Sequence, residues 1–131
     1  MANRAGDGLA QAARDLEHAR HARDDGDHEW ACFAAQQSAE KAVKAALLAL
    51  GGVGWGHSVL RLLADLGQRQ PLPSDLLDAA RRLDHHYVLT RYPNGFPAGA
   101  PRDYYTAAEA EQAIDDAAAI LDLCRQLVRQ P

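Results

Sequence analysis

The sequence predicts an all-α protein, a five-helix antiparallel bundle with a long loop, rich in proline and glycine, before the last helix. Alanine and leucine dominate the chain, β-branched residues are few, and no stretch alternates polar and apolar residues with a period of two. Apolar residues instead recur at intervals of three and four, the spacing of one helix face. A chain of 131 residues has the size of one domain, so we expect residues 1–131 to share a single core.

The net charge and the hydropathy of the chain exclude several classes of protein. The formal net charge is -4 at pH 7, whereas proteins that coat nucleic acid non-specifically carry a basic surface. No apolar run reaches the length of a membrane span, and the N-terminal segment is too polar for a secretory signal. We therefore expect a cytoplasmic protein with no membrane partner. Cys32 and Cys124 stand in apolar helical patterns without Cys-x-x-Cys spacing, which predicts reduced core residues.

The first two helices are expected over residues 7–24 and 28–50. Between them lies the acidic turn of residues 24–27, which lacks the twelve-residue loop of a calcium site, so Asp27 is expected as the N-cap of the second helix. Gly51 and Gly52 mark the end of that helix. A polar stripe interrupts its alanine-rich surface and is expected to face solvent, a partner or a ligand; it consists of Phe33, Gln37, Glu40 and Lys44.

The remaining helices follow from capping residues and helix breakers. Ser58 is the expected N-cap of a short third helix that Gly67 closes. The fourth begins at Pro73-Ser74, and its apolar stripe is expected to reach Tyr87. Residues 88–105 contain too many prolines and glycines for a helix, and Thr106 then caps a last helix that runs to about residue 130. Basic residues crowd one side of the fourth helix, namely Arg81, Arg82, His85 and His86.

Four segments of the chain, in this order and spacing, resemble the HEPN family of small helical domains. They are WACFAAQQSAEKAVK (30–44), GHS (56–58), YVLTRYP (87–93) and YYTAAE (104–109). The resemblance covers most of the chain and implies an HEPN-like homodimer that binds a nucleotide or single-stranded RNA. It also implies a nucleotidyltransferase protein partner, as in a toxin–antitoxin pair.

Six residues are candidates for the ligand site: Lys44, His57, Arg91, Tyr92, Tyr104 and Tyr105. Lysine and arginine bind phosphate, free N–H groups at a helix N-terminus beside His57 add donors, and tyrosines stack on bases. We expect Arg91 and Lys44 to share one anion-binding pocket. The same residues also have a structural interpretation, because Glu40 can pair with Lys44 and tyrosines in proline-rich loops often pack as lids.

Arg81 and His86 are the candidate catalytic residues. Their Arg-x4-His spacing matches ribonuclease members of the resembled family, in which this pair acts without a metal at a dimer interface. Five positions along a helix turn 140° beyond a full turn, so the two side chains converge only if the helix ends between them or a second chain contributes. Some family members carry a tyrosine two residues after the histidine, where this chain has Val88. A solvated basic helix face is the alternative interpretation.

No cofactor and no metal site are expected. His18 and His21 lie three apart in a helix whose other polar residues suit a solvated face better than zinc. The glycines at 51, 52 and 54 follow a helix and lack the Lys-Ser/Thr of a phosphate-binding loop. Three hypotheses remain: a dimeric domain that binds a nucleotide or RNA, a metal-independent endoribonuclease using Arg81 and His86, and a non-catalytic adaptor dimer.

Overall fold

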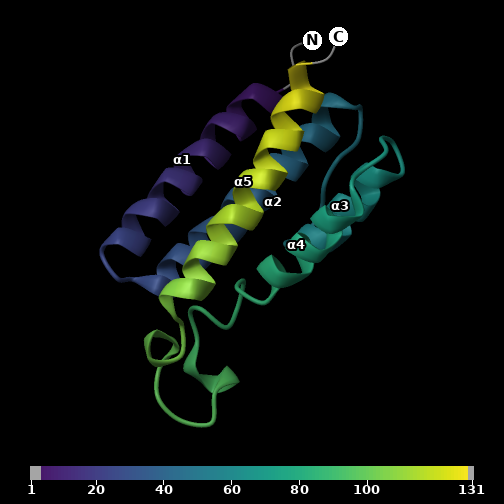
Figure 1. Ribbon diagram of the computed structural model, residues 1–131. Helices are drawn as coiled ribbons and strands as arrows, with labels where there is room; N and C mark the ends of the chain where they lie inside the picture. The colour runs from purple at the N-terminus through teal and green to yellow at the C-terminus, as the bar shows by residue number, and fades with distance from the viewer. Residues whose placement is uncertain (1–3, 130–131) are drawn as a thin grey trace.

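A computed structural model describes residues 4–129, which form five α-helices and no β-strand (Figure 1). The expected all-α helical bundle is confirmed. Its helices are α1 (Ala5–Asp24), α2 (His28–Ala49), α3 (Val59–Gly67), α4 (Ser74–Asp84) and α5 (Ala107–Arg129). Three long helices, α1, α2 and α5, lie side by side, and the shorter α3 and α4 pack as a pair against α2 and α5 (Figure 1).

The chain reverses direction within each helix pair. The helices α1 and α2 run in opposite directions, as do α3 and α4, whereas α2 and α5 run in the same direction (Figure 1). The segment between α4 and α5 therefore lies at one end of the bundle, while α1 begins and α5 ends at the other (Figure 1). Within this segment two short 3-10 turns, Pro93–Gly95 and Pro101–Asp103, each begin at a proline. The expectation that it contains no α-helix is correct.

Two glycines end the first two helices, as their positions in the sequence indicate. Gly26 has φ of 82° and Gly51 has φ of 86°, a left-handed conformation that residues with a side chain rarely adopt. After α2, the amide of Gly52 donates to Leu47 O at 2.8 Å and the amide of Gly51 donates to Leu48 O at 3.1 Å. These two bonds satisfy carbonyls that would otherwise lack partners at the helix end.

Side-chain caps start two of the three helices for which a cap was expected. Ser58 Oγ accepts from the amide of Arg61 at the start of α3, as predicted. Thr106 Oγ1 accepts from the amide of Glu109, and Glu109 Oε1 accepts in return from the amide of Thr106, which forms a capping box before α5. Asp27 occupies the N-cap position of α2, but its side chain makes no capping hydrogen bond.

The fourth helix ends three residues earlier than expected. The prediction that its apolar stripe reaches Tyr87 is wrong, because α4 stops at Asp84 and residues 85–91 form turns. The amide of His86 donates to Leu83 O at 2.9 Å, an i to i−3 bond of a tightened last turn. Thr90 Oγ1 donates to His86 O at 2.7 Å, so a side chain takes the carbonyl that a continuing helix would use.

Small residues let the helices approach closely. A Cβ atom at Gly8 of α1 would lie only 3.1 Å from the Cβ of Ala45 on α2. Cys32 and Cys124 are free and fully buried, and burial raises the pKa of both thiols to about 12, which confirms the reduced core residues that were expected. None of the described helices combines the length and the apolar character that crossing a bilayer requires.

Candidate nucleic-acid interface and adjacent cavity

Arg91 lies among aromatic rings from two segments of the chain. Its Cζ atom is 4.4 Å from the ring centroid of Phe33 on α2, 4.9 Å from that of Tyr87 and 5.3 Å from that of Tyr92. These distances are within the range of cation–π contacts. Its Nε and Nη2 atoms both donate to Tyr87 O. We call this group, with the neighbouring Trp30 ring 6.4 Å from Phe33, the Arg91 surface.

A buried carboxylate links two further candidates to the Arg91 surface. Glu40 is 5% exposed and accepts from Lys44 Nζ at 3.0 Å, while both of its oxygens lie 3.2 Å from His57 Nδ1. Gln36 donates to Glu40 and to the carbonyl of His57, which fixes the segment before α3. The His57 ring stacks on Tyr87 with centroids 4.6 Å apart. Lys44 and Arg91 are thus joined through a continuous series of contacts.

The N-terminus of α3 does not offer the free donors that the sequence suggested beside His57. The carboxylate of Asp84, at the end of α4, accepts from Val59 N at 2.6 Å, from Leu60 N at 3.2 Å and from Ser58 Oγ at 2.7 Å. An anion of the chain itself therefore occupies the position that an external phosphate would take. Of the stripe expected to face solvent, a partner or a ligand, Glu40 instead lies buried beneath His57.

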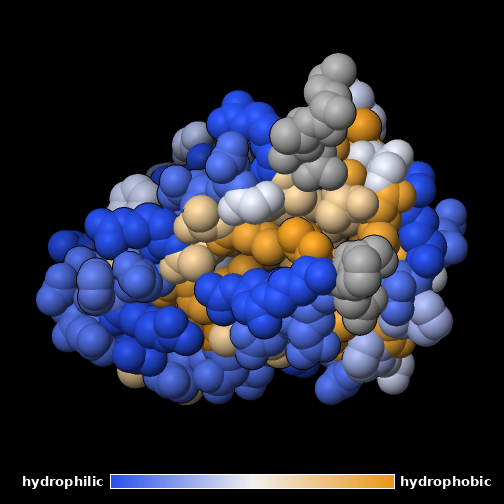
Figure 2. Space-filling view, turned by 90° about the horizontal axis from the view of Figure 1, so that it is seen from above, coloured by the Kyte–Doolittle hydropathy of each residue, from blue (hydrophilic) through white to orange (hydrophobic). Residues whose placement is uncertain are grey.

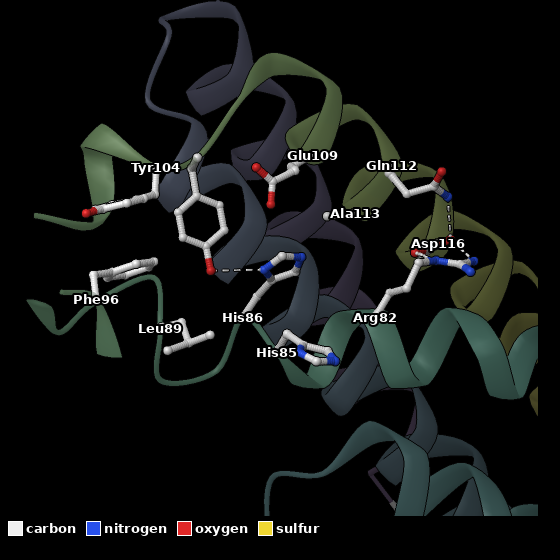
Figure 3. Close-up of a pocket in the computed structure, with 11 residues that line it drawn as sticks. Arg82, His85, His86, Leu89, Phe96, Tyr104, Glu109, Gln112, Ala113 and Asp116 are labelled. Atoms are coloured by element: carbon white, nitrogen blue, oxygen red, sulfur yellow. Dashed lines mark hydrogen bonds and ion pairs between the residues drawn. The ribbon is translucent and has the colours of Figure 1, made fainter. Parts of the chain in front are cut away.

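A separate cavity of about 440 Å³ lies between the end of α4, the loop that follows and the start of α5 (Figure 3). His86 is 9% exposed and lines it, with Nδ1 3.3 Å from the hydroxyl of Tyr105. Burial lowers the pKa of His86 below its usual value, although the carboxylates of Glu109 and Asp116 act in the opposite direction. Burial also raises the pKa of Tyr105. His86 is therefore mostly neutral at pH 7.

An ion pair and two stacked rings complete the cavity. Arg82 Nε and Nη2 each donate to Asp116 at 2.9 Å, a bidentate contact, and Gln112 donates to the same carboxylate (Figure 3). The rings of Phe96 and Tyr104 stack at 4.2 Å and 11°. The half-exposed Arg82 is thus paired with a buried carboxylate.

Arg81 and His86 do not meet in one cavity of the chain. Arg81 donates to Asp78 at 2.7 Å and faces a different hollow, beside Leu60 and Asp84. The helix does end between Arg81 and His86, yet it is the neighbouring Arg82 that shares the cavity with His86. Arg81, Arg82 and His85 are exposed, as a solvated basic helix face predicts, whereas His86 departs from that face and is buried in the cavity. Within residues 4–129, no three His, Cys, Asp or Glu side chains are grouped as metal ligands would be.

Comparison with known proteins places the chain among its relatives. The family model described as HEPN domain matches residues 5–127. The chain belongs to the HEPN domain family. The crystal structure of TT1696 from Thermus thermophilus shares 50% sequence identity with this HEPN domain at a TM-score of 0.93, covering 96% of this chain and 99% of that one. The resemblance seen in the four sequence segments is therefore confirmed.

Two further relatives extend the comparison. ST0689, an archaeal HEPN homologue, is 41% identical at a TM-score of 0.83, with 98% of this chain and 100% of that chain covered. A protein of Methanocaldococcus jannaschii named "Putative toxin MJ1304" is 24% identical over 131 residues, which are 93% of this chain and 86% of that protein.

In this HEPN domain the six candidate ligand residues fall into two groups. Lys44, His57, Arg91 and Tyr92 belong to the Arg91 surface and the Glu40 network beside it, whereas Tyr104 and Tyr105 line the cavity. Residues that sequence reasoning did not assign to a ligand site also contribute, namely Trp30, Phe33, Tyr87, Arg82, Glu109 and Asp116. Tyr87 could have been found from the sequence, because it belongs to the family-like segment 87–93. The contact of Asp116 with Arg82 could not, because the two residues are 34 positions apart and no nearby residue indicates it.

Proposed function

We propose that this HEPN domain binds single-stranded RNA or a nucleotide through the Arg91 surface. The observation that carries the proposal is the setting of Arg91, which lies against three aromatic rings and forms no ion pair with a carboxylate of residues 4–129. A guanidinium has five N–H donors in a planar fork that matches phosphate. Two of these groups bind Tyr87 O, so the other donors remain for a phosphate of the ligand.

The rings beside Arg91 supply the second kind of contact that a single strand needs. Trp30 and Tyr92 are each 51% exposed, so a face of either ring is open to an unpaired base. Base stacking on aromatic side chains contributes roughly 1–3 kcal/mol per base and tolerates any sequence. Arg102 lines the same shallow hollow as Arg91 and Trp30, which brings a second cation to this hollow. The confined basic area agrees with a ligand that bends into it rather than with a rigid duplex.

The relatives support a toxin-like role for this binding. The family match covers most of the chain, and the Methanocaldococcus jannaschii relative carries the word toxin in its name. We propose that the protein works as a homodimer and pairs with a nucleotidyltransferase protein that restrains it. Co-purification of the chain with the product of a neighbouring nucleotidyltransferase gene tests the pairing, and failure of the two to associate would remove that part of the proposal.

Fluorescence anisotropy with a labelled single-stranded RNA tests the binding site. Replacing Arg91 with alanine should weaken binding by about tenfold or more, because a charge-assisted bond and a stacked cation are lost together. Arg125→Ala is the matched control, since it removes the same charge near the far end of α5, where Arg125 forms an ion pair with Asp122. Equal RNA affinity for the parent and Arg91→Ala, with both proteins folded by circular dichroism, would exclude the Arg91 surface as the binding site.

A metal-independent endoribonuclease is the second candidate function. The observation in its favour is His86, a neutral imidazole that lines a cavity and is able to accept the proton of an RNA 2′-hydroxyl. Because Arg81 faces another hollow, this mechanism requires Arg81 from a second copy of the chain. The test is to incubate RNA in EDTA with the parent protein, with His86→Ala and with Arg81→Ala. Cleavage by the His86→Ala variant would contradict this mechanism. If the parent protein neither binds nor cleaves RNA, the result supports the third hypothesis, a non-catalytic adaptor dimer.

A further inference from the structure

The cavity beside His86 differs in charge from the Arg91 surface. Its lining contains one arginine and two carboxylates, and two N–H groups of Arg82 are already bound to Asp116. Glu109 is left without a cationic partner among residues 4–129, and the buried His86 adds no positive charge at neutral pH. The lining is therefore negative overall, which disfavours a phosphate and favours a cation.

Glu109 offers one carboxylate oxygen to a ligand. Its Oε1 atom accepts from the amide and the hydroxyl of Thr106 in the capping box. In the described part of the chain, its Oε2 atom accepts no hydrogen bond, and the carboxyl group points toward His86 (Figure 3). Tyr105 lines the same cavity. The capping box holds the first oxygen, so the side chain presents the second one in a fixed direction.

Aromatic rings form another part of the wall. Phe96 and Tyr104 stack parallel at 4.2 Å, and Tyr105 meets His86 edge-on with ring centroids 5.4 Å apart. The faces of aromatic rings attract cations, most strongly where water is excluded. A carboxylate oxygen and several rings around one space are the two features that hold an ammonium or a guanidinium group.

We propose that this cavity binds a small organic cation, an alkylammonium or a guanidinium. The cation lies against the rings of Phe96 and Tyr104 and donates a hydrogen bond to Glu109 Oε2. This site is distinct from the Arg91 surface and goes beyond the binding of RNA or a nucleotide. The same chemistry is available from a free polyamine and from an arginine or lysine side chain of a polypeptide.

Calorimetry with the full chain tests the proposal and distinguishes the two sources. The probes are agmatine, spermidine and an arginine dipeptide capped at both ends, with AMP as the anionic comparison. At least one cationic probe should bind, and AMP should not compete with it. Tighter binding of agmatine or spermidine indicates a free amine, whereas tighter binding of the capped dipeptide indicates a polypeptide side chain.

Two glutamate variants make the test specific. Glu109→Gln should weaken the cation by about tenfold or more, because a hydrogen bond to a charged group is lost, while glutamine preserves the capping box. Glu111→Gln removes the same charge two residues along α5, where Glu111 contacts Arg23 instead of the cavity, and should bind as the parent does. Equal weakening in both variants, or no binding of any cationic probe by the parent, overturns the proposal. Arg91→Ala should bind the cationic probe as tightly as the parent does. A failure of the proposed RNA site can therefore be distinguished from a failure of the cation site.

Discussion

At the scale of single residues, Asp84 has a structural role that the sequence did not reveal. One carboxylate at the end of α4 accepts three hydrogen bonds from the start of α3, 24 to 26 positions earlier in the chain. The side chain thus acts as a cap for a helix other than its own. Ser58 was predictable as an N-cap because its bond spans three residues, whereas no local pattern indicates a cap that arrives from another helix.

Replacing Asp84 with alanine should lower the free energy of unfolding by roughly 1–3 kcal/mol, because two amides at the start of α3 lose their acceptor. Urea unfolding followed by circular dichroism measures the change. Asp78→Ala is the matched control, since that aspartate lies on the same helix and forms an exposed ion pair with Arg81, and it should have little effect. Similar losses of unfolding free energy in both variants would show that the three hydrogen bonds of Asp84 stabilise the fold no more than an exposed ion pair does.

His86 makes stability depend on pH in a defined direction. Burial lowers its pKa in the folded state, so below the ordinary value near 6.5 the unfolded chain binds more protons than the folded one. Stability should therefore fall as the pH drops through about 6.5 toward the lower pKa of the folded state. The urea midpoint of the parent should decrease between pH 7.5 and pH 5.5, and His86→Gln should show a smaller decrease.

At the scale of helices, the bounds that local chemistry sets were predictable and those set by distant contacts were not. Gly51 correctly marked the end of α2, and Thr106 correctly marked the start of α5. Both were predictable because a left-handed glycine and a capping box each depend on only a few adjacent residues. The end of α4 was misplaced since Tyr87 continues the apolar spacing, yet its ring stacks on His57 from another segment. The candidate site follows the same rule: Arg91 was identifiable by type, but its contact with Phe33 spans 58 positions and needed the fold.

Replacing a glycine with alanine should have opposite effects on stability at the end of α2 and inside α1. Gly51→Ala should lower the free energy of unfolding by about 1–2 kcal/mol, because φ of 86° is strained for any residue with a Cβ. A Cβ at this position meets no atom within 4 Å, so the loss comes from the backbone alone. Gly6→Ala, inside α1 and equally free of contacts, should instead raise it by up to about 1 kcal/mol. Thermal or urea unfolding of both variants checks the pair, and a loss at Gly6 or a gain at Gly51 would contradict it.

At the scale of the whole molecule, large apolar side chains remain exposed at both ends of the bundle. Trp30 and Tyr92 belong to the Arg91 surface, and Val88 lies in the same 87–92 segment. Leu48 lies in the last turn of α2, and Val53 follows that helix. Seen from the end where α5 finishes, a band of apolar side chains lies between hydrophilic ones (Figure 2). Exposed apolar area of this kind typically marks an interface with another protein.

Light scattering at micromolar concentration should therefore report a mass of twice the 14.2 kDa chain. The dimer follows from the exposed apolar side chains and from a small, alanine-rich core, which leaves surface for a second copy to cover. Dilution should shift the mass toward that of one chain as the dimer dissociates. A mass of 14.2 kDa at every concentration would contradict the dimer and, with it, any reaction that needs Arg81 and His86 from two copies.

The shared direction of α2 and α5 also determines where a tag can be attached without covering the candidate sites. The start of α1 and the end of α5 lie together, and the loop between α4 and α5 lies at the opposite pole (Figure 1). A biotin or fluorophore attached at the start of α1 or at the end of α5 would therefore stand a full helix length, roughly 30 Å, from the segment that holds Arg91. Immobilised by such a tag, the protein presents the loop pole to the solution, so surface-based titrations with RNA or amines sample both sites without steric interference from the support.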